Sequence, residues 1–202
     1  MVNIIGDSHT RSFGNLKRLN AYYLGKGMEF NLEHDKIENI KSKISQINPN
    51  LNDTNYLYFG EPNVRFQLAK DHHIFKNRKI DEVYPKIDKP YLNKVIDNYS
   101  NLIDKLHFRC KILTPTTTYP PSIPAMSYLV EKLKDNFGEL VVDIFTDTLD
   151  DGVVKKFLRM EDFNYDPIHC NSNIVRLFEN KVGMKFEYEQ KPNQSHLGTI
   201  IL

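Results

Sequence analysis

The sequence predicts an α/β fold, a three-layer αβα sandwich built around a parallel sheet of about five strands. The order of apolar patterns along the chain supports this prediction. Short apolar runs alternate along the chain with segments whose apolar residues recur every three or four positions. Such alternation is typical of βαβ units, in which helices cover both faces of a parallel sheet.

The expected strands are short apolar runs between turn residues. Residues 2–5 stop at Gly6, which is the pattern of a buried strand. Further strands are expected at residues 21–24, 56–59, 111–113 and 140–145.

The expected helices carry apolar residues at helical spacing. Residues 10–19 place Phe13, Leu16 and Leu19 on one face. Other helices are expected at residues 34–47, 91–106, 125–137 and 171–180, with a short helical turn at residues 153–158.

Length and composition indicate one domain. The chain has 202 residues, which is an ordinary single-domain length, and we assign residues 1–182 to that domain. Residues 183–202 form a C-terminal tail in which residues 199–202 are a candidate edge strand. The sequence does not indicate an oligomeric state.

Charge and hydropathy exclude several classes of protein. With 27 Lys and Arg against 26 Asp and Glu, the chain lacks the positive charge of a protein that binds nucleic acid through phosphates. It also lacks a long apolar run for a membrane span and the pattern of a signal peptide. Two cysteines do not make a disulfide framework. We therefore expect a soluble cytoplasmic protein without a nucleic-acid or membrane partner.

Ser8 is the first candidate for chemistry. It follows an expected strand and precedes an expected helix, where unpaired backbone N–H groups stabilise negative charge. A serine hydroxyl is a weak nucleophile and needs a nearby base. The structural alternative is that Ser8 only caps the helix.

Asp166 and His169 are the candidate partners of Ser8. The carboxylate three residues before the histidine is within reach of its ring, where it would fix the tautomer and leave the other nitrogen as a base. A loop aspartate and a surface histidine that never meet are the structural alternative. Both ends of the chain can reach the carboxyl edge of one sheet, where such folds bind ligands.

An esterase also needs donors for the oxyanion. Candidates are the backbone N–H groups of Ser8 and Gly25 and the side chain of Asn63. Arg65 is either a clamp for a polar or anionic substrate group or a salt-bridge partner of Glu61 or another carboxylate. We expect His9 to line the pocket beside Ser8.

These blocks resemble those of SGNH/GDSL hydrolases, whose sandwich has a flavodoxin-like layout. Ile4-Ile5-Gly6-Asp7-Ser8-His9 is similar to the first block in its GDSH variant, Gly25 to the second-block glycine, and Asp166-Pro167-Ile168-His169 to the last block. The resemblance covers about residues 2–182. It implies that Ser8 is the nucleophile, His169 the base and Asp166 its orienter, with backbone donors at Ser8 and Gly25.

The third block departs from the family pattern Gly-x-Asn-Asp. Pro62 stands where the oxyanion-hole asparagine would fall, and Asn63 stands one position later. The segment Gly60-Glu61-Pro62-Asn63-Val64-Arg65 looks more like a divergent branch with a Gly-Glu-x-Asp-x-Arg block. Asn63 or Arg65 is then the candidate third donor, and the alternative is that this donor is absent.

The resemblance implies a serine esterase that acts on a small acyl ester, such as an O-acetyl group of a carbohydrate, through an acyl-enzyme. This chemistry needs no metal or organic cofactor. An O-acyltransferase would use the same steps with a sugar hydroxyl as acceptor. The altered third block keeps a second class open, an inactive module that binds a glycan or a protein partner.

A metal-dependent alternative uses the same residues. Asp7-Ser8-His9 is an Asp-x-His after a strand, as in metallophosphoesterases, but the further Gly-Asp-x-x-Asp and Gly-Asn-His motifs of that family do not occur. Two divalent ions need more ligands than Asp7 and His9. His72 and His73 are adjacent and point apart, which favours a solvated loop. The sequence therefore predicts no metal site.

Overall fold

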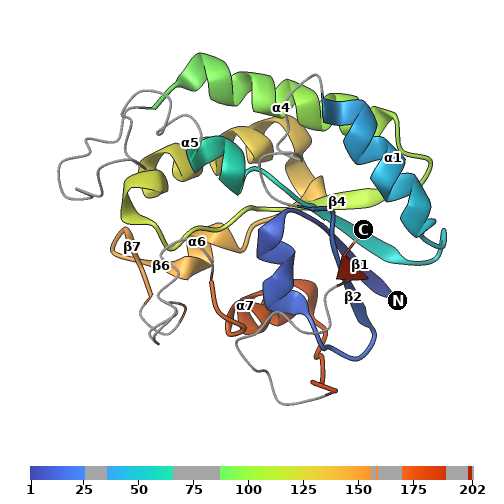
Figure 1. Cartoon of the computed structure of the whole chain (residues 1–202). Helices are drawn as coiled ribbons and strands as arrows, with labels where there is room; N and C mark the ends of the chain where they lie inside the picture. Colours follow the sequence, from blue (N-terminus) through green and yellow to red (C-terminus); the bar gives the residue numbers. More distant parts are fainter. Residues whose placement is uncertain (26–35, 66–86, 156–157, 159–169, 190–199, 202) are drawn as a thin grey trace.

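The computed structural model describes residues 1–25, 36–65, 87–155, 158, 170–189 and 200–201. These residues form one parallel sheet of six strands and a small antiparallel pair (Figure 1). The sheet strands are β1 (Val2–Gly6), β2 (Leu19–Tyr23), β3 (Thr54–Tyr58), β4 (Cys110–Leu113), β5 (Val141–Val142) and β8 (Ile200–Ile201). Their order across the sheet is β5-β4-β3-β1-β2-β8, which confirms the predicted α/β fold with a parallel sheet.

Helices cover both faces of the sheet (Figure 1). One face packs against α1 (Ile37–Ile47), α4 (Lys89–Asp104) and α5 (Ile123–Phe137) through Ile5, Leu57 and Ile112. The other face packs against α7 (Ile174–Val182) and the 3-10 helix η1 (Ser8–Phe13) through Ile4, Tyr56 and Tyr58. Because successive strand side chains point to opposite faces, neighbouring residues of each strand enter different halves of the core.

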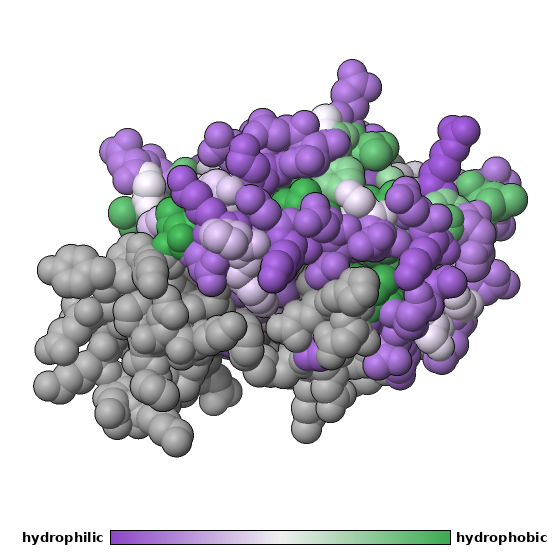
Figure 2. Space-filling view, turned by 90° about the horizontal axis from the view of Figure 1, so that it is seen from above, coloured by the Kyte–Doolittle hydropathy of each residue, from purple (hydrophilic) through white to green (hydrophobic). Residues whose placement is uncertain are grey.

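The longest helix, α4, shows why the sequence forms this layer. Asp88 caps it by accepting the backbone N–H of Tyr91 over 3.0 Å, and Pro90 in the first turn needs no helical donor. Its apolar stripe is buried on the sheet. The stripe consists of Leu92, Val95, Ile96, Tyr99 and Leu102. The face of the molecule shown in Figure 2 is mostly hydrophilic with scattered apolar residues, as expected for amphipathic outer helices.

The helix expected over residues 10–19 is wrong. The chain forms the short helix η1, and then Asn15 and Arg18 adopt φ values of 62° and 63°, which an α-helix does not tolerate. Leu16 and Leu19 are buried as predicted, but Leu19 is already part of β2. Their spacing of three arises from a turn followed by a strand.

The C-terminal half also corrects two expectations. The helical turn expected at residues 153–158 is wrong at its start, where Val153 and Val154 are instead the second strand of a hairpin, β6 (Leu149–Asp150) and β7 (Val153–Val154). At its end, the N–H of Leu158 donates to the carbonyl of Lys155 over 3.0 Å, as in a helical turn. Asp151 and Gly152 join them with φ values of 49° and 77°, which this dipeptide adopts readily. The strand expected at residues 140–145 shortens to β5, since Asp143 accepts the N–H of Thr146 over 3.1 Å. The short helix α6 (Phe145–Thr148) begins at that turn.

Short elements lie beside α5 and at the edge of the sheet. The 3-10 helices η4 (Pro120–Ser122) and η5 (Gly138–Leu140) flank α5. The tail contributes β8, which pairs in parallel with β2 through Tyr22 and Tyr23. Among the described helices, none combines the length and the apolar character that a membrane crossing requires.

Candidate active site

The candidate site lies at the carboxyl edge of the sheet, where β1 meets β3. From β1 the chain passes to β2 on one side, whereas β3, β4 and β5 extend the sheet on the other side. In open parallel sheets, ligands bind in the crevice at such a reversal of strand order. The segments that leave the sheet there are residues 7–9, after β1, and residues 60–65, after β3.

Gly6 brings these two segments together. A Cβ atom at Gly6 would lie 2.0 Å from the backbone oxygen of Tyr58, so only glycine fits at the end of β1. The next residue continues the contact, because the N–H of Asp7 donates to that same oxygen over 3.2 Å. The loop that carries Ser8 therefore starts directly against the end of β3.

Asp7 fixes the start of η1. Its Oδ1 atom accepts the backbone N–H of His9 over 2.9 Å, and its carbonyl accepts the N–H and the hydroxyl of Thr10 over 3.1 and 2.9 Å. The helix cap is thus Asp7, one residue before the position that the structural alternative gave to Ser8. Ser8 is the first residue of η1 and keeps 9% of its surface exposed, against 1% for Asp7 and 2% for His9. Of these three residues, Ser8 reaches the surface most.

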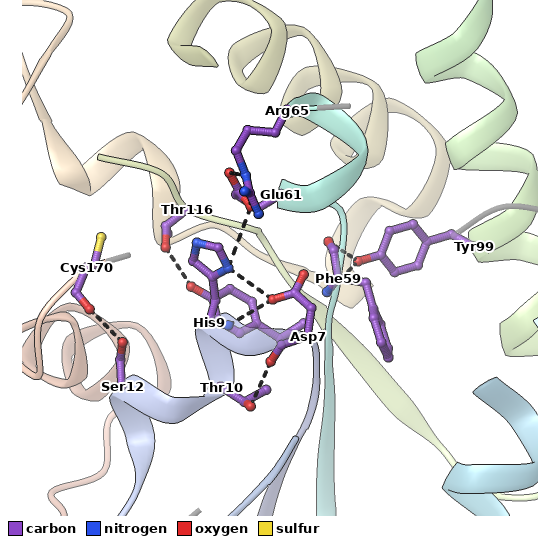
Figure 3. Close-up of polar contacts among 11 residues, drawn as sticks. Asp7, His9, Thr10, Ser12, Phe59, Glu61, Arg65, Tyr99, Thr116 and Cys170 are labelled. Carbon is purple, nitrogen blue, oxygen red and sulfur yellow. Dashed lines mark hydrogen bonds and ion pairs between the residues drawn. The ribbon is translucent and has the colours of Figure 1, made fainter. Parts of the chain in front are cut away.

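His9 lies between two buried carboxylates (Figure 3). Its Nδ1 atom is 3.0 Å from Oδ1 of Asp7 and 4.0 Å from Oε2 of Glu61, and its ring meets the Tyr58 ring edge-on at 6.2 Å. Burial lowers the pKa of His9, but the charges of Asp7 and Glu61 outweigh burial, and the pKa is raised above its ordinary value. The site therefore favours a protonated imidazolium that joins the ends of β1 and β3.

Glu61 also binds Arg65. The Nε atom of Arg65 donates to both carboxylate oxygens of Glu61, over 2.8 and 3.0 Å, across one helical turn. Glu61 is completely buried, whereas the Arg65 side chain keeps 23% of its surface exposed. The salt bridge that the sequence offered as one alternative for Arg65 is therefore present. A substrate contact of Arg65 stays a prediction.

The remaining candidate oxyanion donors lie on either side of β1. Asn63 is completely buried, and its amide donates to the phenol oxygen of Tyr91 over 3.2 Å. Gly25 follows β2 with a φ of 132°, and the preceding Leu24 donates to the carbonyl of Gly6 over 3.1 Å. Gly25 thus directly follows a residue that is bonded to the end of β1. The roles of Asn63 and Gly25 at an oxyanion stay predictions.

The predicted base and its orienter, His169 and Asp166, lie outside the described residues. Cys170, the next residue along the chain, is among the described residues and is buried. The hydroxyl of Ser12 in η1 donates to the carbonyl of Cys170 over 2.6 Å (Figure 3). The helix that begins at Ser8 is therefore bonded directly to the residue that follows His169.

Sequence reasoning missed two features of this site. The sequence suggested Glu61 as a salt-bridge partner of Arg65, yet its Oε2 atom also lies 4.0 Å from Nδ1 of His9. The second feature is Tyr58, whose phenol oxygen is 2.6 Å from the Thr116 hydroxyl after β4. Burial raises the pKa of Tyr58 well above its ordinary value, so the phenol stays neutral. The available signal was the acidic residue Glu61, two positions after the apolar run that ends at Phe59.

The comparisons with known proteins add no family. The chain matches no protein-family model and no curated protein. In the part of the chain that the structure describes, no three His, Cys, Asp or Glu side chains form a group with the arrangement of a metal site.

Proposed function

We propose that the protein is a serine esterase in which Ser8 attacks a small acyl ester, with an O-acetyl group on a carbohydrate as the candidate substrate. His169 is the proposed base and Asp166 its orienter. The observation that carries the proposal is the bond between Ser12 and Cys170, because it joins the helix that starts at Ser8 to the residue that directly follows the Asp-x-x-His motif in the sequence.

The placement of Ser8 supports a nucleophilic role. Ser8 stands at the carboxyl edge of the central strand β1, at the reversal of strand order, and its hydroxyl is not the cap of η1. The residues on both sides of it are held by hydrogen bonds, since the N–H of Asp7 donates to the carbonyl of Tyr58 and the N–H of His9 donates to the carboxylate of Asp7. A nucleophile on a backbone fixed in this way attacks from a constant position, which lowers the entropic part of the barrier.

The proposed reaction has two halves. His169 takes the proton of the Ser8 hydroxyl as Oγ attacks the ester carbonyl carbon, and the N–H groups of Ser8 and Gly25 stabilise the resulting oxyanion. The C–O bond to the alcohol breaks, the alcohol takes the proton from His169, and an acyl-Ser8 ester remains. In the second half, water attacks the acyl carbon while His169 takes a proton from it. The bond between the acyl carbon and Oγ of Ser8 then breaks, the acid leaves, and His169 returns the proton to Oγ.

The acceptor distinguishes hydrolysis from transfer. If a sugar hydroxyl replaces water in the second half, the same residues perform O-acyl transfer. We favour hydrolysis, and competition between water and an added sugar for the acyl-enzyme separates the two reactions.

Turnover of p-nitrophenyl acetate tests the proposal. We expect measurable release of p-nitrophenol by the wild-type protein, persistence of the activity in EDTA, and loss to background in Ser8→Ala. Ser45→Ala is the matched control, because the Ser45 hydroxyl donates to a backbone carbonyl within α1 and is exposed. Equal rates for wild type and Ser8→Ala would contradict the proposal, and an activity lost in EDTA would favour metal-dependent chemistry.

A further inference from the structure

The contacts of His9 indicate a role in positioning. Its backbone N–H and its ring Nδ1 both meet Oδ1 of Asp7, at 2.9 and 3.0 Å. These two contacts close a compact loop of three residues with Ser8 at its centre. The same ring nitrogen lies 4.0 Å from Glu61, which belongs to the segment after β3.

We propose that His9 is a positioning residue, held between the carboxylates of Asp7 and Glu61, that joins the segment after β1 to the segment after β3 and so fixes the backbone N–H of Ser8. This inference rests on the proposed function, in which that N–H stabilises the oxyanion. It differs from the sequence prediction that His9 binds substrate. With 2% of its surface exposed, His9 is poorly placed to touch a substrate directly.

Charge balance supports this role. The described groups that face His9 are Asp7 on its own segment, Glu61 and Arg65 after β3, and the neutral Tyr58 at the end of β3. Asp7 and Glu61 supply two buried negative charges, whereas Arg65 supplies one positive charge. Among these described groups, a protonated His9 and Arg65 together balance the two carboxylates, and a buried charge is less costly when an opposite charge pairs with it.

The pKa of His9 follows from the same arrangement. Burial acts to lower it, the carboxylates of Asp7 and Glu61 raise it with a larger combined effect, and Arg65 lowers it. Removing the charge of Glu61 should therefore lower the pKa of His9, and removing the charge of Arg65 should raise it. Glu61 and Arg65 are bonded to each other, so a general disturbance of the fold should move the pKa of His9 in the same direction in both variants. Opposite changes in this pKa indicate a specific electrostatic contact.

An NMR titration of the histidine side chains tests the contact without any assay of activity. We expect the histidine resonance that is missing from His9→Gln to titrate in the wild-type chain with a pKa above the ordinary value of 6.5. That resonance should move to a lower pKa in Glu61→Gln and to a higher pKa in Arg65→Gln. A His9 pKa that is not raised in the wild type, or pKa changes of the same sign in both variants, would overturn the inference.

Kinetics of His9→Gln separate positioning from substrate binding. A misplaced oxyanion donor should lower kcat for p-nitrophenyl acetate about 10- to 100-fold, with KM changed less than about twofold. A raised KM with an unchanged kcat would instead make His9 a substrate contact and overturn the inference. A wild-type protein without Ser8-dependent turnover would contradict the proposed function, while the titrations would still decide whether His9 joins the two segments.

Discussion

Gly6 and Tyr58 lie in direct backbone contact, so that a Cβ atom at Gly6 would be 2.0 Å from the oxygen and 2.7 Å from the carbonyl carbon of Tyr58. Neither strand can move aside easily, because β1 and β3 are paired along their whole length and are buried on both faces. This contact decides where the loop that carries Ser8 leaves the sheet.

Replacing Gly6 by alanine should therefore be severely destabilising. We expect Gly6→Ala to lower the free energy of unfolding by about 3 kcal/mol or more, since the added atom collides with a backbone that cannot retreat. Urea denaturation followed by circular dichroism measures this loss. Gly152→Ala is the control, because no atom lies within 4 Å of its Cβ position and only its φ of 77° is unfavourable. That variant should lose about 1 kcal/mol, and equal losses would contradict the account.

The hydroxyl of Tyr99 stabilises the end of β3. It donates to the carbonyl of Phe59 over 2.6 Å and accepts the N–H of Phe59 over 3.1 Å, two residues before Glu61. Tyr99→Phe leaves both buried backbone groups without this partner and should lower the free energy of unfolding by about 1–3 kcal/mol. Tyr128→Phe removes a hydroxyl bonded to Asn93 at the surface and should change stability by less than about 0.5 kcal/mol. The reverse ranking would show that this bond does not stabilise the fold.

The bond between Ser12 and Cys170 predicts a kinetic effect away from the nucleophile. Ser12→Ala removes the donor to the Cys170 carbonyl, so the residue that follows His169 loses this bond to η1. We expect kcat for p-nitrophenyl acetate to fall about tenfold, because misplacement of a catalytic group is costly. Ser45→Ala removes a comparable bond within α1 and should leave kcat unchanged. If both variants keep the wild-type rate, the Ser12 bond does not position the base.

Stability should depend on pH through His9. Its pKa is raised in the folded protein by Asp7 and Glu61 against the opposing effect of burial, so between the unfolded and folded values the folded state binds more protons. The contribution of His9 is therefore complete below about pH 6.5 and is lost as pH rises through the folded pKa. Urea denaturation at several pH values measures this loss. As pH rises, the free energy of unfolding should decline less in His9→Gln than in Ser8→Ala, which retains His9. Parallel declines in both variants would contradict the assignment.

The layers of the fold could be predicted because local patterns determine them. The run before Gly6 and the apolar stripe of α4 are visible in any short window of sequence, and each gave the correct type of element. The helix expected over residues 10–19 failed because Leu19 belongs to a strand, so a spacing of three did not reflect a helical face. The hairpin at Asp151 and Gly152 carried a recognisable turn signal that the expected helical turn overlooked.

The site was predictable only in part, since its contacts join distant residues. Ser8 could be placed at a strand end from its neighbours alone. The approach of His9 to Glu61 depends on β1 lying beside β3, which local patterns do not specify. The bond from Ser12 to Cys170 likewise spans the two ends of the domain. The chemistry of such residues can be inferred only when the order of the strands in the sheet is known.

Labelling with a fluorophosphonate probe, followed by mass spectrometry of the digested protein, tests the central claim most directly. The probe reacts with a serine only when a neighbouring base activates its hydroxyl. The account predicts one modified residue, Ser8, with labelling absent in Ser8→Ala, strongly reduced in His169→Gln and unchanged in Ser45→Ala. An unlabelled wild-type protein, or a label on another serine that persists in Ser8→Ala, would contradict it.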